Sequence, residues 1–203
     1  LQWRASCLRR RVASLGRLPL DANFVVVSVE SELSDTQVYP FHLYADRIRA
    51  RFGAEFYEVR EAALLGAPEN ARCPRVKWVA FQTWFDLTAE EMTQRANRIQ
   101  TVFPNARLIY LDFFAPLDLR YAEVLAPHIT HYVKKQVFAD FKSYGTETVG
   151  HTNLTDYYGR RFGIPLQKVR WNLPPEFLPK LVIGSNFCVS PHMIDRFSVP
   201  LLH

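Results

Sequence analysis

The stretch that decides the fold is Asn23-Phe-Val-Val-Val-Ser-Val-Glu30, an apolar, β-branched run that ends in a polar residue. A continuous apolar run of this length predicts a strand that is buried on both faces. Similar runs recur at residues 76–84, 106–112 and 129–136. Segments with helical spacing of apolar residues lie between the runs, so the order of elements predicts βαβ units and a parallel sheet.

Two weaker runs extend this sheet. Residues 55–59 alternate between polar and apolar, as a strand with one solvated face does, and residues 181–189 form a further apolar run. We therefore predict an α/β fold with a doubly wound, mostly parallel, Rossmann-like sheet of five to six strands and an irregular C-terminal extension.

A helix is expected over residues 39–52, because its apolar residues recur at helical spacing and Gly53 stands where a C-terminal glycine belongs. The preceding segment, residues 31–37, is polar and rich in turn-forming residues. It predicts the loop at the carboxyl end of the first strand, with Asp35 or Thr36 as the helix cap.

Two later helices are also expected. One covers about residues 88–102, with Asp86 or Thr88 as its cap and acidic residues in its first turn. The other opens at Asn153 and ends at Gly163.

Length and composition indicate one sizeable globular domain, since 48% of the 203 residues are hydrophobic and 22% are charged. We assign residues 21–190 to the Rossmann-like domain. Residues 1–20 are expected to form an Arg-rich lead-in helix, and residues 191–203 a tail that begins a missing region. The chain starts with Leu, which fits a piece of a longer polypeptide.

The net charge of +5 is confined to the lead-in, where residues 1–20 hold five arginines and no acid. The remaining chain balances 20 basic against 20 acidic residues, which argues against nucleic-acid binding. No apolar stretch reaches the length of a membrane span. Three widely spaced cysteines without a Cys-x-x-Cys pair indicate reduced thiols and a cytoplasmic location.

Ligands of parallel sheets bind beyond the carboxyl ends of the strands, so the polar residues at those ends are the candidate site. After the first strand come Glu30, Glu32 and Asp35, which could act as a base or bind sugar hydroxyls; the alternative is a solvated loop with a helix cap. His42 is a fourth catalytic candidate, and a partly buried helix position explains it equally well.

The next two strands end in residues suited to substrate binding. A Trp beside an amide, as in Trp84 and Gln82, suits a sugar ring, although Trp84 could equally be a core residue. Asp112 could orient a hydroxyl or could accept backbone amides of the turn that follows it.

Cationic candidates end the fifth strand. Lys134 and Lys135 point to opposite faces of a strand, so only one of them would face a cleft and compensate a phosphate; paired surface lysines are the alternative. His151 precedes a helix N-terminus that could receive an anion, or is a plain loop residue.

Several site types are not supported by the sequence. His128 and His131 lack the spacing of a metal pair on a strand, so no metal is expected. No glycine-rich dinucleotide motif, phosphate-binding loop or Gly-x-Ser-x-Gly elbow is present.

The order of segments resembles one half of a two-domain, GT-B-type glycosyltransferase. The segments that carry the resemblance are Tyr39-Pro-Phe-His42, Leu108-Ile-Tyr-Leu-Asp112, His131-Tyr-Val-Lys-Lys135, Leu173-Pro-Pro-Glu176 and Val182-Ile-Gly-Ser185. The resemblance covers about residues 22–190 and implies the amino-terminal, acceptor-binding half of a bacterial-type sugar transferase.

In that family the other half holds the nucleotide-sugar donor, and this chain has no counterpart of it. The resemblance therefore implies a sugar or other hydroxyl-bearing acceptor as partner, no cofactor bound by this chain, and a second domain elsewhere. The chain alone should not be a working enzyme. Two alternatives stay open: a non-catalytic ligand- or protein-binding α/β domain, and a flavodoxin-like module of the response-regulator kind.

Overall fold

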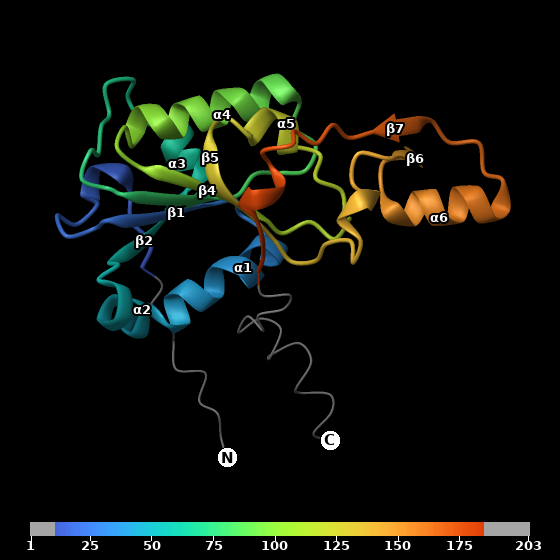
Figure 1. Ribbon diagram of the computed structural model, residues 1–203. Helices are drawn as coiled ribbons and strands as arrows, with labels where there is room; N and C mark the ends of the chain where they lie inside the picture. The colour runs from blue at the N-terminus through green and yellow to red at the C-terminus, as the bar shows by residue number, and fades with distance from the viewer. Residues whose placement is uncertain (1–10, 185–203) are drawn as a thin grey trace, which may run out of the picture.

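A computed structural model describes residues 11–184, which form a six-stranded parallel sheet in the order β2-β1-β3-β4-β5-β8 (Figure 1). The strands of this sheet are β1 (Phe24–Ser28), β2 (Phe56–Arg60), β3 (Trp78–Phe81), β4 (Arg107–Asp112), β5 (Ile129–Lys134) and β8 (Leu181–Ile183). The predicted α/β, Rossmann-like sheet of five to six strands is confirmed.

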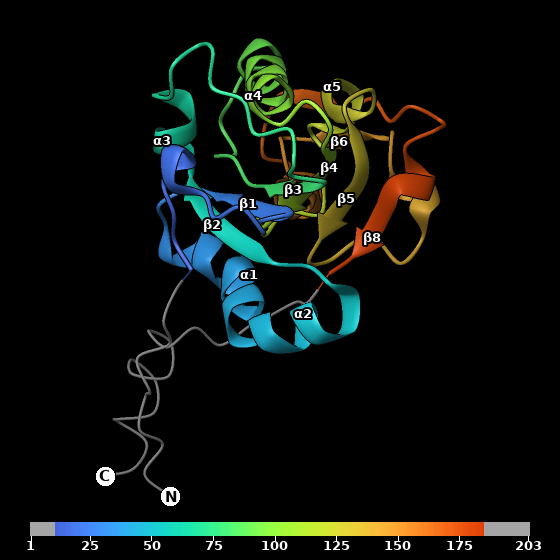
Figure 2. The same cartoon turned by 90° about the vertical axis from the view of Figure 1, so that its left-hand side faces the viewer.

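Helices cover both faces of the sheet (Figure 2). One face carries α3 (Glu61–Leu65), α4 (Ala89–Val102) and α5 (Ala122–Leu125). The other carries α1 (Glu32–Leu43) and α2 (Ala45–Phe52). Because β2 and β3 flank β1 on opposite sides, right-handed crossovers place α1 and α3 on opposite faces.

Burial on both sides explains the apolar run of β1, which ends in Ser28. Val25 and Val27 face the larger core under α3, α4 and α5, whereas Val26 faces the smaller core under α1 and α2. All three side chains are at most 1% exposed. Burial on both faces therefore explains a continuous run where a one-sided strand would alternate.

The two faces are covered unequally. Beyond α1 and α2, the sheet carries an open apolar groove of about 470 Å³. Its floor and walls include Phe24, Trp78, Ile109, Val133 and Val182, contributed by β1, β3, β4, β5 and β8.

The predicted loop at residues 31–37 is wrong, because α1 begins at Glu32 and covers most of that segment. Ser31 caps this helix: its hydroxyl accepts a hydrogen bond from the Leu33 amide at 3.1 Å. The helix then breaks at Tyr44, so the single predicted helix 39–52 is the end of α1 followed by α2.

The lead-in is also different from the prediction. Residues 1–10 lie outside the described part of the chain, and residues 11–20 hold only a short 3-10 helix, Leu15–Arg17, instead of an α-helix. Val12 forms a parallel bridge with Glu58, with the Ala13 amide donating to the Glu58 carbonyl at 2.9 Å. The lead-in therefore covers backbone groups that an edge strand would otherwise leave unpaired.

Between β5 and β8 the chain forms further elements that are not part of the six-stranded sheet. They are the 3-10 helices Phe141–Ser143 and Leu178–Lys180, the antiparallel strands β6 (Glu147–Val149) and β7 (Lys168–Arg170), and α6 (Asn153–Phe162). Figure 1 shows β6, α6 and β7 projecting beyond the sheet. The predicted helix is confirmed, with Gly163 as its left-handed C-cap and Thr152, not Asn153, as its N-cap.

The predicted tail, residues 191–203, lies outside the described residues. In the described range 11–184, no helix combines the length and the apolar character needed to cross a bilayer.

Candidate functional site

The carboxyl ends of the strands bring several of the predicted residues to one edge of the sheet. Asp112 and Lys134 are the last residues of β4 and β5 and are paired in register, and Gln82 directly follows β3. All three side chains are buried, each 1% exposed. The sequence therefore located the edge correctly, but these three side chains lie beneath its surface.

Asp112 is the centre of a closed polar cluster. Its Oδ2 accepts from the Tyr132 hydroxyl at 2.6 Å and from Lys134 Nζ at 2.7 Å. Its Oδ1 accepts from the Phe114 amide at 2.9 Å. The carboxylate thus has its partners inside the protein, which is what a buried charge requires. Burial, with the nearby Asp112 charge adding to it, raises the pKa of Tyr132 well above its ordinary value.

A chain of amides joins this cluster to α1. Gln82 Nε2 donates to the Ser34 carbonyl at 3.0 Å and to Gln37 Oε1 at 3.1 Å, and Gln37 Nε2 donates to the Asp112 carbonyl at 2.9 Å. Within the described residues, Gln82 Oε1 is buried without a hydrogen-bond partner. These bonds fasten the start of α1 to the ends of β3 and β4.

An open aromatic cleft lies above the buried cluster, with a volume of about 440 Å³. Two aromatic pairs form its walls, one from each of the loops that follow β3 and β4: Trp84 and Phe85, and Phe113 and Phe114. Trp84 meets Phe113 edge to face at 6.2 Å, and Phe85 meets Phe114 at 5.6 Å between ring centroids. Leu33 of α1 also lines the cleft.

The aromatic wall is held in place by hydrogen bonds to the loop behind it. The Tyr121 hydroxyl donates to the carbonyls of Trp84 and Leu87 at 3.3 and 3.2 Å. Burial raises the pKa of Tyr121 to about 12, so this hydroxyl keeps its proton at neutral pH. Trp84 and Phe85 nevertheless stay 38% and 51% exposed, which leaves their rings open to a ligand.

Two cations border the cleft. Arg120 is held by a two-point ion pair with Asp118, at 2.8 and 3.0 Å, and lies over the Trp171 ring at 5.4 Å. Lys135 is half-buried, and burial lowers its pKa; the Asp112 charge opposes this shift in part, and the Lys134 charge adds to it. Of the two predicted lysines, Lys135 therefore lines the cleft and Lys134 is committed to Asp112.

The three acidic residues predicted as bases after the first strand lie at different positions. Glu30 is exposed in the short connection between β1 and α1, three residues before Leu33 of α1. The side chain of Glu32 lies outside the described part of the structure. Asp35 lies on α1, 3.9 Å from Arg60.

His42 is buried on the α1 side of the sheet, away from the open cleft. Its Nε2 is 2.7 Å from Glu58 Oε2, and its Nδ1 accepts from the Arg11 amide at 3.1 Å. Both ring nitrogens are thus bonded within the protein, so the structure explains His42 as a residue that joins α1, β2 and the lead-in.

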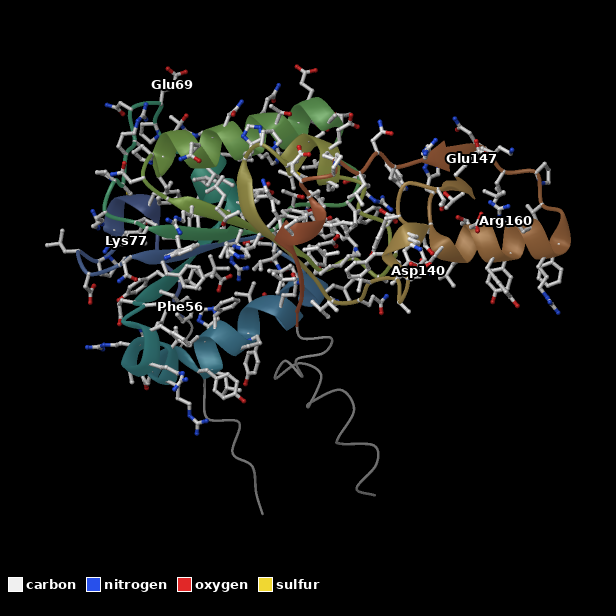
Figure 3. All side chains as sticks on the ribbon, viewed as in Figure 1. Phe56, Glu69, Lys77, Asp140, Glu147 and Arg160 are labelled. Carbon is white, nitrogen blue, oxygen red and sulfur yellow. The ribbon has the colours of Figure 1, made fainter. Side chains whose placement is uncertain are left out.

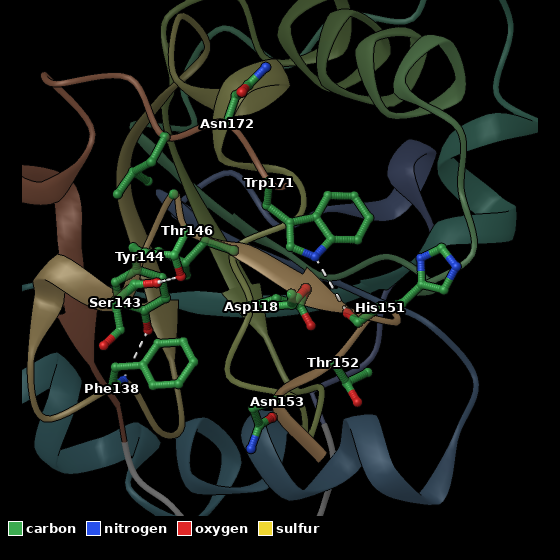
Figure 4. Close-up of a pocket in the computed structure, with 14 residues that line it drawn as sticks. Asp118, Phe138, Ser143, Tyr144, Thr146, His151, Thr152, Asn153, Trp171 and Asn172 are labelled. Atoms are coloured by element: carbon green, nitrogen blue, oxygen red, sulfur yellow. Dashed lines mark hydrogen bonds between the residues drawn. The ribbon is translucent and has the colours of Figure 1, made fainter. Parts of the chain in front are cut away.

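His151 lies at a second, much smaller cavity, shown in Figure 4. The cavity holds about 30 Å³, which is room for a water molecule and not for a sugar. Trp171 Nε1 donates to the His151 carbonyl at 3.4 Å, and Thr152 already caps the helix that follows. At the N-terminus of this helix, the Thr152 hydroxyl accepts from the Thr155 amide at 3.1 Å; the anion position itself stays a prediction.

The described residues, 11–184, contain no group of three or more His, Cys, Asp or Glu side chains that could hold a metal ion. The sequence analysis missed Phe85, Phe113, Phe114 and Arg120 as cleft residues. A usable signal was present in the aromatic pairs Trp84-Phe85 and Phe113-Phe114, which stand just beyond the ends of β3 and β4. Phe113 and Phe114 are also core residues, 4% and 6% exposed, so the pairs alone do not distinguish a cleft from a core.

No protein-family model matches the chain, and comparisons with curated proteins and with solved structures found no significant match.

Proposed function

We propose that the aromatic cleft binds a hydroxyl-bearing ring ligand, and that the chain is the acceptor-binding domain of a glycosyltransferase-like protein. The observation that carries this proposal is the position of Trp84 and three phenylalanines, Phe85, Phe113 and Phe114, at the carboxyl edge of the parallel sheet, beside Lys135. This edge is where parallel sheets bind ligands. An exposed Trp ring offers the apolar surface that the flat face of a sugar covers.

The chemistry assigned to the cleft is acceptor positioning. The sugar ring would stack on Trp84, and Lys135 and Arg120 would compensate phosphate charge that arrives with a nucleotide-sugar donor. A base must reach the acceptor hydroxyl, and Glu30 is an exposed predicted acid three residues before the cleft residue Leu33. The donor itself would be held by a second domain, and we further propose a cytoplasmic location on the cysteine pattern.

Under this proposal, the other predicted residues act from behind the cleft. Asp112, Lys134 and Gln82 fix the strand ends and α1, so they position the loops that carry the aromatic rings. They are positioning residues, because their polar atoms are bonded within the protein or buried.

The test is a titration of the full chain with a panel of methyl glycosides. Binding is detected by saturation-transfer NMR and by chemical-shift changes of the Trp84 indole signal. Replacing Trp84 by Ala should weaken binding by about tenfold or more, because a ring contact contributes on the order of 1 kcal/mol beyond its buried area. Trp78→Ala is the matched control, since Trp78 lies in the groove on the other face. Equal loss in both variants, or no binding to any glycoside, would refute the proposal.

A second candidate function is a non-catalytic domain that binds an apolar partner. The open groove lined by Trp78, Ile109 and Val182 favours it, because exposed apolar surface of this extent is typical of interaction sites. The two functions separate experimentally: glycosides should perturb Trp84 and leave Trp78 unchanged, whereas an apolar partner should do the reverse.

A further inference from the structure

Helix α6 turns its apolar side to solvent. Leu154, Tyr157, Tyr158 and Phe162 are 60%, 55%, 50% and 64% exposed, although an amphipathic helix normally buries such a face. The rings lie against one another: Tyr158 and Phe162 stack at 6.0 Å with an interplanar angle of 13°. The exposed apolar surface continues past the helix through Ile164, which is 44% exposed.

The inner side of α6 explains this orientation. Gly159 is buried against Val149 of β6, so closely that a Cβ atom added there would lie 2.6 Å from a Val149 methyl carbon. Asp156 accepts from the Val149 amide at 2.7 Å. The small and polar side of the helix is therefore fastened to the hairpin, and the aromatic side cannot turn inward without breaking these contacts.

The charge around this face is positive. Residues 147–170 carry four cationic side chains against two acidic ones. Arg160 reaches back to Asp156 and to the Glu147 carbonyl, on the hairpin side visible in Figure 3. Arg161 instead lies over the Phe162 ring at 5.7 Å, on the aromatic side.

We propose that this face of α6 docks on an anionic lipid surface. Aromatic and aliphatic side chains around a basic residue are the combination that an interfacial helix inserts at the headgroup level. Tyr rings favour the membrane–water interface, and Arg161 complements negatively charged headgroups. The strands β6 and β7 and the helix α6 project beyond the sheet (Figure 1). A flat bilayer can therefore reach the exposed face of α6, whereas a protein partner would need a groove that receives the helix. This inference is independent of the function proposed for the cleft.

The test is cosedimentation of the full chain with phosphatidylcholine vesicles that do or do not contain phosphatidylglycerol. The chain should bind only the anionic vesicles, and the double variant Arg161→Glu, Phe162→Ser should bind about tenfold more weakly or worse. The matched control is Arg51→Glu, Phe52→Ser: Arg51 lies over the Phe52 ring at 5.8 Å, and Phe52 is 72% exposed on α2.

Circular dichroism and thermal melting of both variants show whether each still folds. If the α6 variant unfolds, the milder single change Arg161→Gln replaces it, and weaker binding to anionic vesicles is again expected. Three results would overturn the proposal. They are no binding of the intact chain to anionic vesicles, equal loss in the control, and concentration-dependent self-association that the α6 variant abolishes.

Discussion

At the scale of single residues, the ion pair of Asp112 and Lys134 makes a strong prediction, because both side chains are 1% exposed. Removing one partner leaves a buried charge uncompensated, which typically costs about 3–5 kcal/mol. We therefore expect Lys134→Met to lower the free energy of unfolding by about that amount in urea titrations. Lys168→Met is the control, because its pair with Glu147 is exposed and screened by solvent and should contribute far less. Similar costs for the two variants would contradict the burial of the first pair.

Lys135 makes a prediction about pH. Burial lowers its pKa below the ordinary value of 10.5, so folding disfavours its charged form. Between the folded pKa and 10.5 the unfolded chain binds more protons, and stability therefore rises with pH across that window. Relative to Lys135→Met, the native chain should gain stability as the pH approaches 10.5, measured by urea unfolding at a series of pH values. An anionic ligand in the cleft should raise the pKa of Lys135, which NMR of the methylated amine would detect.

At the scale of the elements, α4 is the helix that its own sequence specifies best. The Thr88 hydroxyl accepts from the Glu91 amide at 3.2 Å, and the Glu91 carboxylate accepts from the Thr88 amide at 2.8 Å. Thr88→Ala should cost about 1 kcal/mol in unfolding free energy, whereas Thr93→Ala, inside the same helix, should cost less. The Thr88 amide and hydroxyl both donate to the Glu91 carboxylate and lower the pKa of Glu91. Thr88→Ala keeps the amide bond and loses the hydroxyl bond, so the part of the stability difference due to the hydroxyl should shrink as acid protonates that carboxylate.

The helices and strands differ in how well the sequence predicts them. Strands that are buried on both faces have continuous apolar runs in the sequence, and these runs predicted β1, β3, β4 and β5. The start of α1 was missed because polar residues dominate its first turns and mimic a turn-rich loop. The strands β6 and β7 have three residues each and little burial, so no apolar pattern marks them. The order of the strands was enough to predict that the candidate site residues gather at the carboxyl edge of the sheet. Which of them are buried and which line the open cleft depends on side-chain packing, and no local sequence pattern reports that packing.

At the scale of the whole molecule, helices cover one face of the sheet fully, whereas α1 and α2 cover the other face only in part and leave a groove. Two neighbouring residues of β4 lie on these two faces. Leu108 is 1% exposed in the core under the helices, whereas Ile109 lines the open groove. Leu108→Ala should cost about 2–5 kcal/mol in unfolding free energy, since it leaves a cavity in packed surroundings. Ile109→Ala should cost clearly less, because water can fill the space that it leaves. Equal costs in urea titrations of the full chain would mean that the groove is covered in solution. The apolar-partner function, which needs that face free, would then lose its support, while the cleft at the carboxyl edge would be unaffected.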